Sequence, residues 1–406
     1  MNVKINVKHF AKIETASIEL KDLILFVGEN NTGKSMMMML IYAVLCEVKR
    51  MTSPGGGLDF SVEGINKTEK GYTIQNSWIK EWEKSFNDFL YINKEKIIEY
   101  YSLYKNNVDN NSAIDSLIYT PSYDNEIDGK KWVGNALILH IFSLSRFFPM
   151  DCVYLPASRT GLQLLHRYFF SEKDKMVIRT VPWVNNGQYL PSFGLTMPVY
   201  DFLQFLLTHH VRESLDKRSD DVINFINQNL LDGKLEIKYG EDNYVPSEST
   251  NARIPLYLAS SMINEVSPLV KILTSATPFS YIFYDEIETC LHPLKQGYMA
   301  RTIVRMVNSG WKMIVSTHSD TMASNFNNLL MISHKEKVEG KKIIEKLGYD
   351  LSDILTKEVR VYEFQSRGNN SRIEEVQYSN SSIGYDFNLF TQNINKLYEE
   401  TEIISL

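Results

Sequence analysis

The stretch GENNTGKS, Gly28 to Ser35, decides the fold of this chain. It follows an apolar run, Leu23 to Val27, and leads into Met36 to Val48, which contains no Gly or Pro. This order predicts a strand, a glycine-bounded loop and a helix, the setting that a phosphate-binding loop requires. An ordinary strand-to-helix turn is the alternative interpretation.

The residues of this loop predict how an anion would be held. Backbone N–H groups of the loop and the helix N-terminus can surround a phosphate. Lys34 is expected to reach the β- and γ-phosphates of a nucleotide, and the Ser35 hydroxyl is expected to ligate Mg²⁺. The predicted nucleotide-binding residues are Gly28, Glu29, Asn30, Asn31, Thr32, Gly33, Lys34, Ser35 and Met36.

Composition narrows the class of protein. The 406 residues, 44% hydrophobic and 23% charged, suit a globular chain with core for two to three domains. A net charge of −6 gives no bulk positive field for nucleic acid, although a local basic patch stays possible. Three scattered cysteines predict neither a disulfide framework nor a zinc site. We expect no signal peptide, no membrane span and a cytoplasmic location.

The segments on either side of the loop carry weaker patterns. Residues 2–20 alternate as two short runs and predict an antiparallel pair of strands. From Asn76 the pattern is helical, and residues 105–130 predict a loop because they are rich in Asn, Asp and Ser. One face of this helix carries a stripe of four aromatic residues: Trp78, Trp82, Phe86 and Phe89. The stripe predicts core packing, with a partner-docking face as the alternative.

A predicted strand, Cys152 to Leu155, ends in PASRTG. Arg159 therefore lies at the carboxyl end of a strand, where ligands bind in open α/β sheets. It could face a nucleotide phosphate or anchor a loop carboxylate, and the sequence favours neither. Residues 162–230 are predicted to be mainly helical, and a polar loop is expected over 240–253.

The segment PLYLASSMINEVSPL predicts a strand over Leu256 to Leu258, then two serines and an amphipathic helix. Ser260 or Ser261 would cap that helix. A serine-capped helix is common, so this segment alone indicates no function.

Two later strands end in residues that suit catalysis. The apolar run Tyr281 to Tyr284 delivers Asp285 and Glu286, and a buried strand would not end in two carboxylates unless a cation or catalysis required them. Asp285 suits a Mg²⁺ site, and Glu286 suits a general base that deprotonates the attacking water. The next helix is expected from Pro293 to about Gly310.

The second of these strands, Lys312 to Thr317, ends in STHSD. His318 should reach the same crevice as the two carboxylates, because the carboxyl ends of parallel strands share one edge. A contact with the γ-phosphate is the prediction for His318, and a purely structural histidine is the alternative.

Four motifs in order, GENNTGKS, LASSMINEVSPL, DEIETCLHPLKQ and STHSD, resemble ABC-type ATPases of the SMC and OLD branch. The resemblance is greatest to compact bacterial AAA-family ATPases found beside anti-phage effectors. It implies ATP and Mg²⁺ as cofactors, with Ser35 and Asp285 as metal ligands. Three residues would be catalytic: Glu286, Lys34 and the switch histidine His318.

The same resemblance makes Ser260 and Ser261 the signature segment, which contacts ATP bound to a partner subunit. The chain is then expected to self-associate around ATP as a dimer or higher oligomer. Met262 replaces the usual signature glycine and would crowd the approach to a γ-phosphate. Three residues of the D-loop region are expected to shape the dimer interface: Glu288, His292 and Gln296. Gln163 is a weak candidate for the Q-loop glutamine.

The fold class implied is α/β: a P-loop NTPase of ABC/SMC type with a mixed central sheet, N-terminal antiparallel strands and a helical insertion. The ATPase domain would comprise 1–50, 150–165 and 231–406, and the insertion 51–149 and 166–230.

The function implied is an ATPase that acts as sensor or scaffold and controls a separate effector, a nuclease or toxin, in bacterial antiviral defence. DNA or a phage-derived molecule could be the trigger. We expect no Toprim nuclease in this chain. The alternative is an ATP-gated, DNA-clamping ATPase of repair or recombination.

Overall fold

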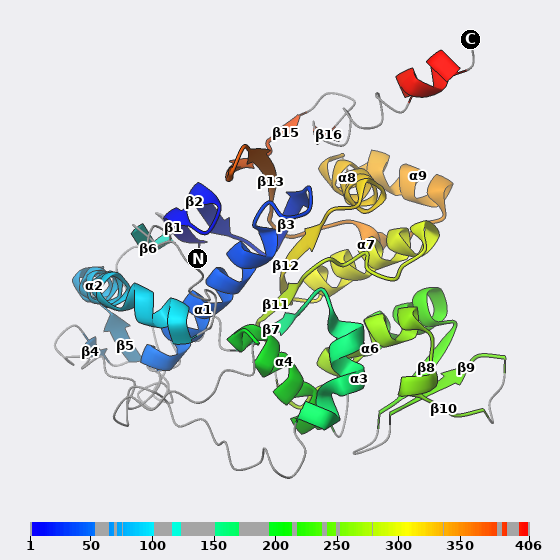
Figure 1. The fold of residues 1–406 in the computed structure, drawn as a ribbon, viewed down its shortest axis with the longest axis horizontal. Helices are drawn as coiled ribbons and strands as arrows, with labels where there is room; N and C mark the ends of the chain where they lie inside the picture. The colour runs from blue at the N-terminus through cyan, green and yellow to red at the C-terminus, as the bar shows by residue number, and fades with distance from the viewer. Residues whose placement is uncertain are drawn as a thin grey trace.

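The computed structural model describes residues 2–52, 65–68, 71–74, 76–100, 116–122, 151–169, 195–212, 217–237, 242–248, 252–277, 279–335, 337–379, 384–387 and 398–404. Within these ranges the largest sheet has nine strands in the order β6-β1-β2-β14-β13-β3-β12-β11-β7. The sheet is mixed, and helices cover both of its faces (Figure 1). The predicted α/β fold class is therefore confirmed.

The P-loop strand β3 (Leu23–Gly28) lies in the parallel half of this sheet. It pairs in parallel with β13 (Val359–Arg367) and with β12 (Lys312–Thr317). Next to β12 follow β11 (Tyr281–Tyr284) and β7 (Cys152–Leu155), again in parallel. A parallel strand covered on both faces needs a continuous apolar run, and all residues of Leu23–Val27 are fully buried.

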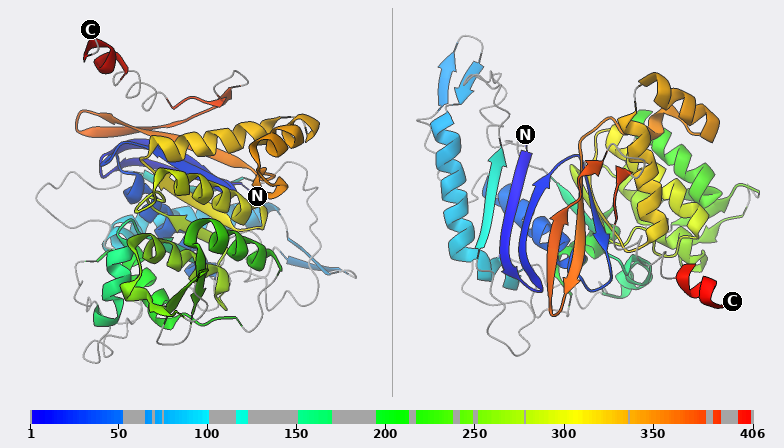
Figure 2. Two further views of the ribbon diagram at one scale, coloured as in Figure 1. Left: turned by 90° about the vertical axis from the view of Figure 1, so that its right-hand side faces the viewer. Right: turned by 90° about the horizontal axis from the view of Figure 1, so that it is seen from above.

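The other half of the sheet begins with the chain's N-terminus. Strands β1 (Asn2–Phe10) and β2 (Ile13–Leu20) pair antiparallel, which confirms that prediction. The strand β14 (Asn370–Glu375) joins them to β13. The prediction of a loop over 105–130 is wrong for β6 (Ser116–Ser122), because this strand pairs with the outer edge of β1. Figure 2 shows these strands side by side.

Helix α1 (Lys34–Thr52) packs on one face of the sheet, against residues such as Phe26 and Phe283. The opposite face is covered by α6 (Ser261–Thr274), α7 (Pro293–Asn308) and α8 (Asp320–His334). Helices α7 and α8 begin after the carboxyl ends of the parallel strands β11 and β12. Helices α1 and α6 therefore lie on opposite faces of the sheet.

Helix α2 (Asn76–Tyr100) packs along β6 at the outer edge of the sheet. Of its predicted stripe, Phe89 packs against the buried core, which fits core packing. The side chains of Trp78, Trp82 and Phe86 lie outside the described part of the chain. So do residues 135–147, for which the apolar sequence predicts a buried helix.

A mainly helical unit lies between β7 and β11. It contains α3 (Arg159–Phe169), α4 (Met197–Thr208), α5 (Lys217–Ile226) and the π-helical turn η4 (Asn227–Leu231). A small sheet of β8 (Gly233–Glu236), β9 (Asn243–Pro246) and β10 (Ile254–Pro255) follows. The polar-loop prediction is wrong at β9, and the predicted strand over 256–258 is instead a 3-10 turn, η5 (Leu256–Leu258).

The remaining described elements are short and lie away from the P-loop. They are β4 (Ile65–Thr68), β5 (Gly71–Ile74), α9 (Lys337–Leu347), η6 (Leu351–Asp353), β15 (Tyr378–Ser379) and β16 (Gly384–Tyr385). No helix in the described ranges is long and apolar enough to cross a membrane.

Candidate functional site

The P-loop has the backbone of an anion-binding turn. Gly28, Asn31 and Gly33 have φ values of 145°, 62° and 96°, so the chain reverses its curvature three times in six residues. A Cβ at Gly28 would lie 2.4 Å from the carbonyl oxygen of Phe364 on β13, which only glycine avoids. Such alternation turns successive N–H groups toward one point and forms a concave nest for an anion.

Lys34 begins α1 and is only 6% exposed. Its Nζ donates to the carbonyl oxygens of Gly28 at 2.8 Å and Glu29 at 2.6 Å. Burial lowers the pKa of Lys34, while the nearby carboxylates, first Asp285 and then Glu288, oppose that change. The ammonium group therefore uses two of its three donors on loop carbonyls, and an incoming phosphate would compete with them.

The other predicted loop residues differ in exposure. The side chains of Glu29, Asn30 and Asn31 are exposed, so these residues can contribute their backbone N–H groups to a phosphate. The Thr32 hydroxyl donates to the carbonyl oxygen of Glu29 at 2.8 Å and stiffens the turn. Ser35 and Met36 are half-buried in the first turn of α1.

Asp285 follows β11 directly and is 2% exposed. Its carboxylate accepts a hydrogen bond from Tyr154 Oη at 2.9 Å and another from Ser316 Oγ. Burial, and next the charge of Asp285, raises the pKa of Tyr154 well above its ordinary value, so this hydroxyl keeps its proton and remains a donor. Strands β7 and β12, on either side of β11, thus orient the carboxylate.

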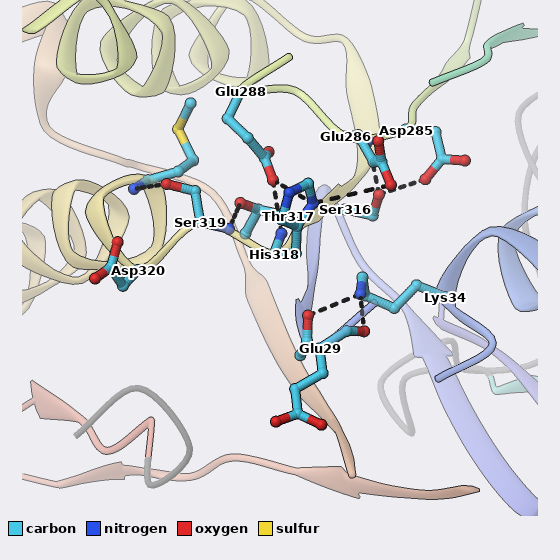
Figure 3. A network of polar contacts seen from close by, with 12 residues as sticks. Glu29, Lys34, Asp285, Glu286, Glu288, Ser316, Thr317, His318, Ser319 and Asp320 are labelled. Atoms are coloured by element: carbon cyan, nitrogen blue, oxygen red, sulfur yellow. Dashed lines mark hydrogen bonds and ion pairs between the residues drawn. The ribbon is translucent and has the colours of Figure 1, made fainter. Parts of the chain in front are cut away.

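Glu286 has φ 46°, in the left-handed region. Its backbone N–H donates to Ser316 Oγ at 2.8 Å, so this hydroxyl links Glu286 and Asp285. Its side chain is 32% exposed, which suits a base that must meet water. Figure 3 shows both carboxylates above Lys34 at the same edge of the sheet.

Arg159 is fully buried, and its contacts match the anchoring alternative. The guanidinium donates to the carbonyl oxygens of Asp285 at 2.6 Å and Glu286 at 3.0 Å, and forms an ion pair with Glu265 of α6. It also lies over the Tyr284 ring, 4.4 Å from its centre. A nucleotide could not reach this group without unpacking the core, so these contacts do not support the predicted cofactor-binding role.

His318 follows β12, is 36% exposed and reaches the same edge. Its Nδ1 lies 2.9 Å from Glu288 Oε1 and 3.8 Å from Glu286 Oε1. The contact with Glu288 raises the pKa of His318, although partial burial lowers it. Burial favours a higher pKa for Glu288, but its contacts with the ring and backbone of His318 outweigh this, and its pKa is lowered.

Ser260 caps α6 as predicted, because its hydroxyl accepts the N–H of Ile263 at 3.4 Å. Ser260 and Ser261 are both exposed, and no hydrogen bond within the described residues joins either to the P-loop. Met262 packs against the core instead of projecting outward. The serines are thus presented at a surface and not at the P-loop of the same chain.

Some functional residues were missed or misplaced by sequence reasoning. Tyr154 gives no signal, because a buried strand often contains a tyrosine. Ser316 begins the STHSD motif, but its sequence position gives no indication that it contacts Asp285. Glu288 was expected at a dimer interface, but its side chain is 6% exposed and contacts His318. Gln163 lies buried between α3 and α6, where it hydrogen-bonds Ser267, and therefore does not fit a Q-loop role.

The residues present fit ATP and Mg²⁺. Mg²⁺ usually takes one or two protein oxygens and completes its shell with phosphate and water. Ser35 and Asp285 can supply those two oxygens, and Lys34 can meet the phosphates. In the described part of the chain no cluster of three or more His, Cys, Asp or Glu residues could hold a metal alone.

The fold and this site define the class of protein as a P-loop α/β domain, with ionisable side chains gathered at the carboxyl edge of its parallel strands. Residues 1–175 match a family model described as an AAA ATPase domain. The matched region contains the P-loop, Tyr154 and Arg159 and ends before Asp285 and His318. No curated protein matches the chain.

Several solved structures resemble the chain at low identity. An SMC head bound to the C-terminal winged-helix domain of ScpA is 12% identical, with 92% of this chain and 97% of that chain covered and a TM-score of 0.40. The SMC head domain from Thermotoga maritima is 12% identical, with 93% of this chain and 100% of that chain covered and a TM-score of 0.36. The ADP conformation of an ATP-binding cassette of an ABC transporter is 11% identical, with 80% of this chain and 85% of that chain covered and a TM-score of 0.30.

Proposed function

We propose that this protein binds MgATP at the P-loop and hydrolyses it to ADP and phosphate. The observation that carries the proposal is the meeting of Lys34, Asp285, Glu286 and His318 at one edge, from the neighbouring parallel strands β3, β11 and β12 (Figure 3). Three separate segments of sequence supply these side chains. An ordinary strand-to-helix turn would not require such a set.

Each side chain has a role that its surroundings support. Lys34 offers a buried positive charge to the β- and γ-phosphates. Ser35 and Asp285 would ligate Mg²⁺, which supplies charge neutralisation on the phosphate oxygens. Glu286, half-exposed beside them, takes a proton from the attacking water, and His318 stabilises charge on the γ-phosphate.

The proposal includes self-association around ATP. The signature serines are exposed, and they follow two exposed apolar residues, Tyr257 and Leu258, 69% and 67% exposed. Leu294, near the N-terminus of α7 in the D-loop region, is 76% exposed. Large exposed apolar side chains beside functional segments suit an interface between subunits. A partner's P-loop would then face Ser260 and Ser261.

The resemblance to ATPases found beside anti-phage effectors supports a finer proposal. The ATP-driven change in assembly would control a separate nuclease or toxin in antiviral defence. Co-expression with the protein encoded beside it should give toxicity that differs between wild type and Glu286→Gln. ATP-dependent, salt-sensitive binding of duplex DNA would instead favour the DNA-clamping alternative.

The central experiment measures phosphate release and particle mass together. Wild type should release phosphate only with both Mg²⁺ and ATP. Glu286→Gln should still bind ATP, lose about 100-fold or more in turnover, and accumulate an ATP-bound assembly in light scattering. Glu339→Gln, on the remote helix α9, is the matched control. Unchanged turnover in Glu286→Gln would refute the role of this residue.

A further inference from the structure

Glu288 makes two contacts with one residue. It lies in the turn after β11, two positions beyond the predicted general base, and its side chain is 6% exposed. Its Oε1 accepts the backbone N–H of His318 at 2.7 Å and lies 2.9 Å from the ring Nδ1 of the same residue (Figure 3). One carboxylate oxygen thus accepts a hydrogen bond from the backbone of His318 and lies within ion-pair distance of its ring.

This contact selects the ring nitrogen that faces substrate. A carboxylate 2.9 Å from Nδ1 favours a proton on that nitrogen, which leaves Nε2 to meet a phosphate. Glu286 lies farther from Nδ1, at 3.8 Å. The charged groups that act on the ring are Glu288, Glu286 and Lys34.

The arrangement separates two tasks that a single carboxylate would perform poorly. A general base must stay able to accept a proton from water. A carboxylate that holds a histidine cation is already neutralised by it. Glu286, half-exposed, is suited to the first task, and the buried Glu288 is suited to the second.

We propose that Glu288 is a positioning residue of the ATPase site, which holds His318 through Nδ1 so that the charged ring presents Nε2–H to the γ-phosphate. This inference rests on the proposed function, because it assigns a partner to the predicted switch histidine. It gives the D-loop region of this chain a role within its own site.

The test uses Glu288→Gln, which keeps the size and an acceptor oxygen but removes the charge. The first readout is the NMR titration of the His318 ring in the nucleotide-free full chain, with the signal assigned from His318→Gln. The titration midpoint should fall in Glu288→Gln. This readout requires no ATP turnover.

The second readout is the pH dependence of kcat. If the histidine cation is needed, kcat falls as pH rises through the pKa of His318 in the complex, and this limb should move to lower pH in Glu288→Gln. At pH 8 kcat should fall about 10-fold while KM changes little, because the lost contact acts in the transition state. Glu288→Asp keeps the charge and should move this limb part of the way back toward the pH at which it lies in the wild type.

Asp320→Asn is the matched control: Asp320 is exposed, lies two residues beyond His318, and its carboxylate accepts the N–H of Thr321. An unchanged His318 titration in Glu288→Gln, or an equal change in Asp320→Asn, overturns the inference. If wild type does not hydrolyse ATP, the proposed function fails, while the ring titration still decides whether Glu288 controls His318. If Glu288→Gln does not fold, Glu288→Asp decides, since the longer contact should also lower the midpoint.

Discussion

Two hydroxyl groups orient Asp285: that of Tyr154, which lies outside the four motifs, and that of Ser316, the first residue of STHSD. Tyr154 and Ser316 lie on the strands that flank β11, and each donates to a different oxygen of the carboxylate. A carboxylate held at both oxygens can turn little, so its direction toward a metal is fixed before the metal binds. This preorganisation is the property that catalysis by charge stabilisation requires.

Tyr154→Phe should therefore weaken the metal site without unfolding the protein. A hydrogen bond to a charged group contributes about 1.5–3 kcal/mol, so we expect about a 10-fold lower kcat and a higher Mg²⁺ concentration at half-maximal rate. Steady-state kinetics over a Mg²⁺ series measure both. Tyr281→Phe removes a buried hydroxyl of β11 away from Asp285 and should leave them unchanged. Equal effects of the two substitutions would contradict the assignment.

At the scale of elements, Arg159 joins β7, β11 and α6. Its guanidinium donates to two carbonyls just after β11, and its ion pair reaches Glu265 in α6. The Thr160 hydroxyl also donates to Glu265. The segment that bears Glu286 and the helix that bears Ser260 are thus connected through one buried cation.

Glu265→Gln should be strongly destabilising, because it leaves the buried charge of Arg159 without its partner. Breaking a buried ion pair from one side costs about 3–5 kcal/mol. Urea denaturation should show this loss. Arg253→Gln breaks the exposed Arg253–Glu236 pair and should cost about 1 kcal/mol or less. Similar losses for both would mean that the buried pair has no special role.

Sequence patterns predicted the elements whose signal is local. The apolar runs of β3, β11 and β12, the cap of α6 and the start of α7 at Pro293 were located correctly, because burial, capping and the fixed proline backbone constrain those residues directly. Strand β6 was missed, because its pairing with β1 depends on a contact more than 100 residues away. The turn η5 was mistaken for a strand, since three apolar residues do not specify a backbone conformation.

The candidate site shows the same difference between local sequence signals, which could be predicted, and contacts between distant segments, which could not. The residues proposed to carry the chemistry stand out in the sequence by type and position: Lys34, Asp285, Glu286 and His318. Arg159 was ambiguous, because an arginine at a strand end suits either a ligand or a carboxylate, and only packing against α6 decides. Tyr154 and the contact of Glu288 with His318 required the strand order and the turn geometry.

At the scale of the whole molecule, the P-loop and the signature serines belong to different surfaces. Helices α1 and α6 lie on opposite faces of the sheet, so one chain does not bring its own Ser260 to its own Gly28. A complete site under the proposed function then needs two copies of the chain. ATP should accordingly increase the fraction of assembled protein.

Tyr257→Ser should weaken this assembly. In a Glu286→Gln background with MgATP, we expect the dissociation constant to rise about 10-fold or more, as for an aromatic interface residue, with ATP binding by the monomer unchanged. Analytical ultracentrifugation measures the association. Leu347→Ser removes an exposed apolar residue, 53% exposed, from α9 and serves as the control. Assembly that resists Tyr257→Ser and yields to Leu347→Ser would place the interface elsewhere.

The left-handed backbone of Glu286 has one more consequence. A residue with a side chain pays about 1 kcal/mol or more in that conformation, and glycine does not. Glu286→Gly should therefore raise the melting temperature of the protein while it abolishes turnover. Under the proposed function, stability and catalysis therefore favour different residues at position 286, and the chain carries the residue that suits catalysis at the cost of a more strained backbone.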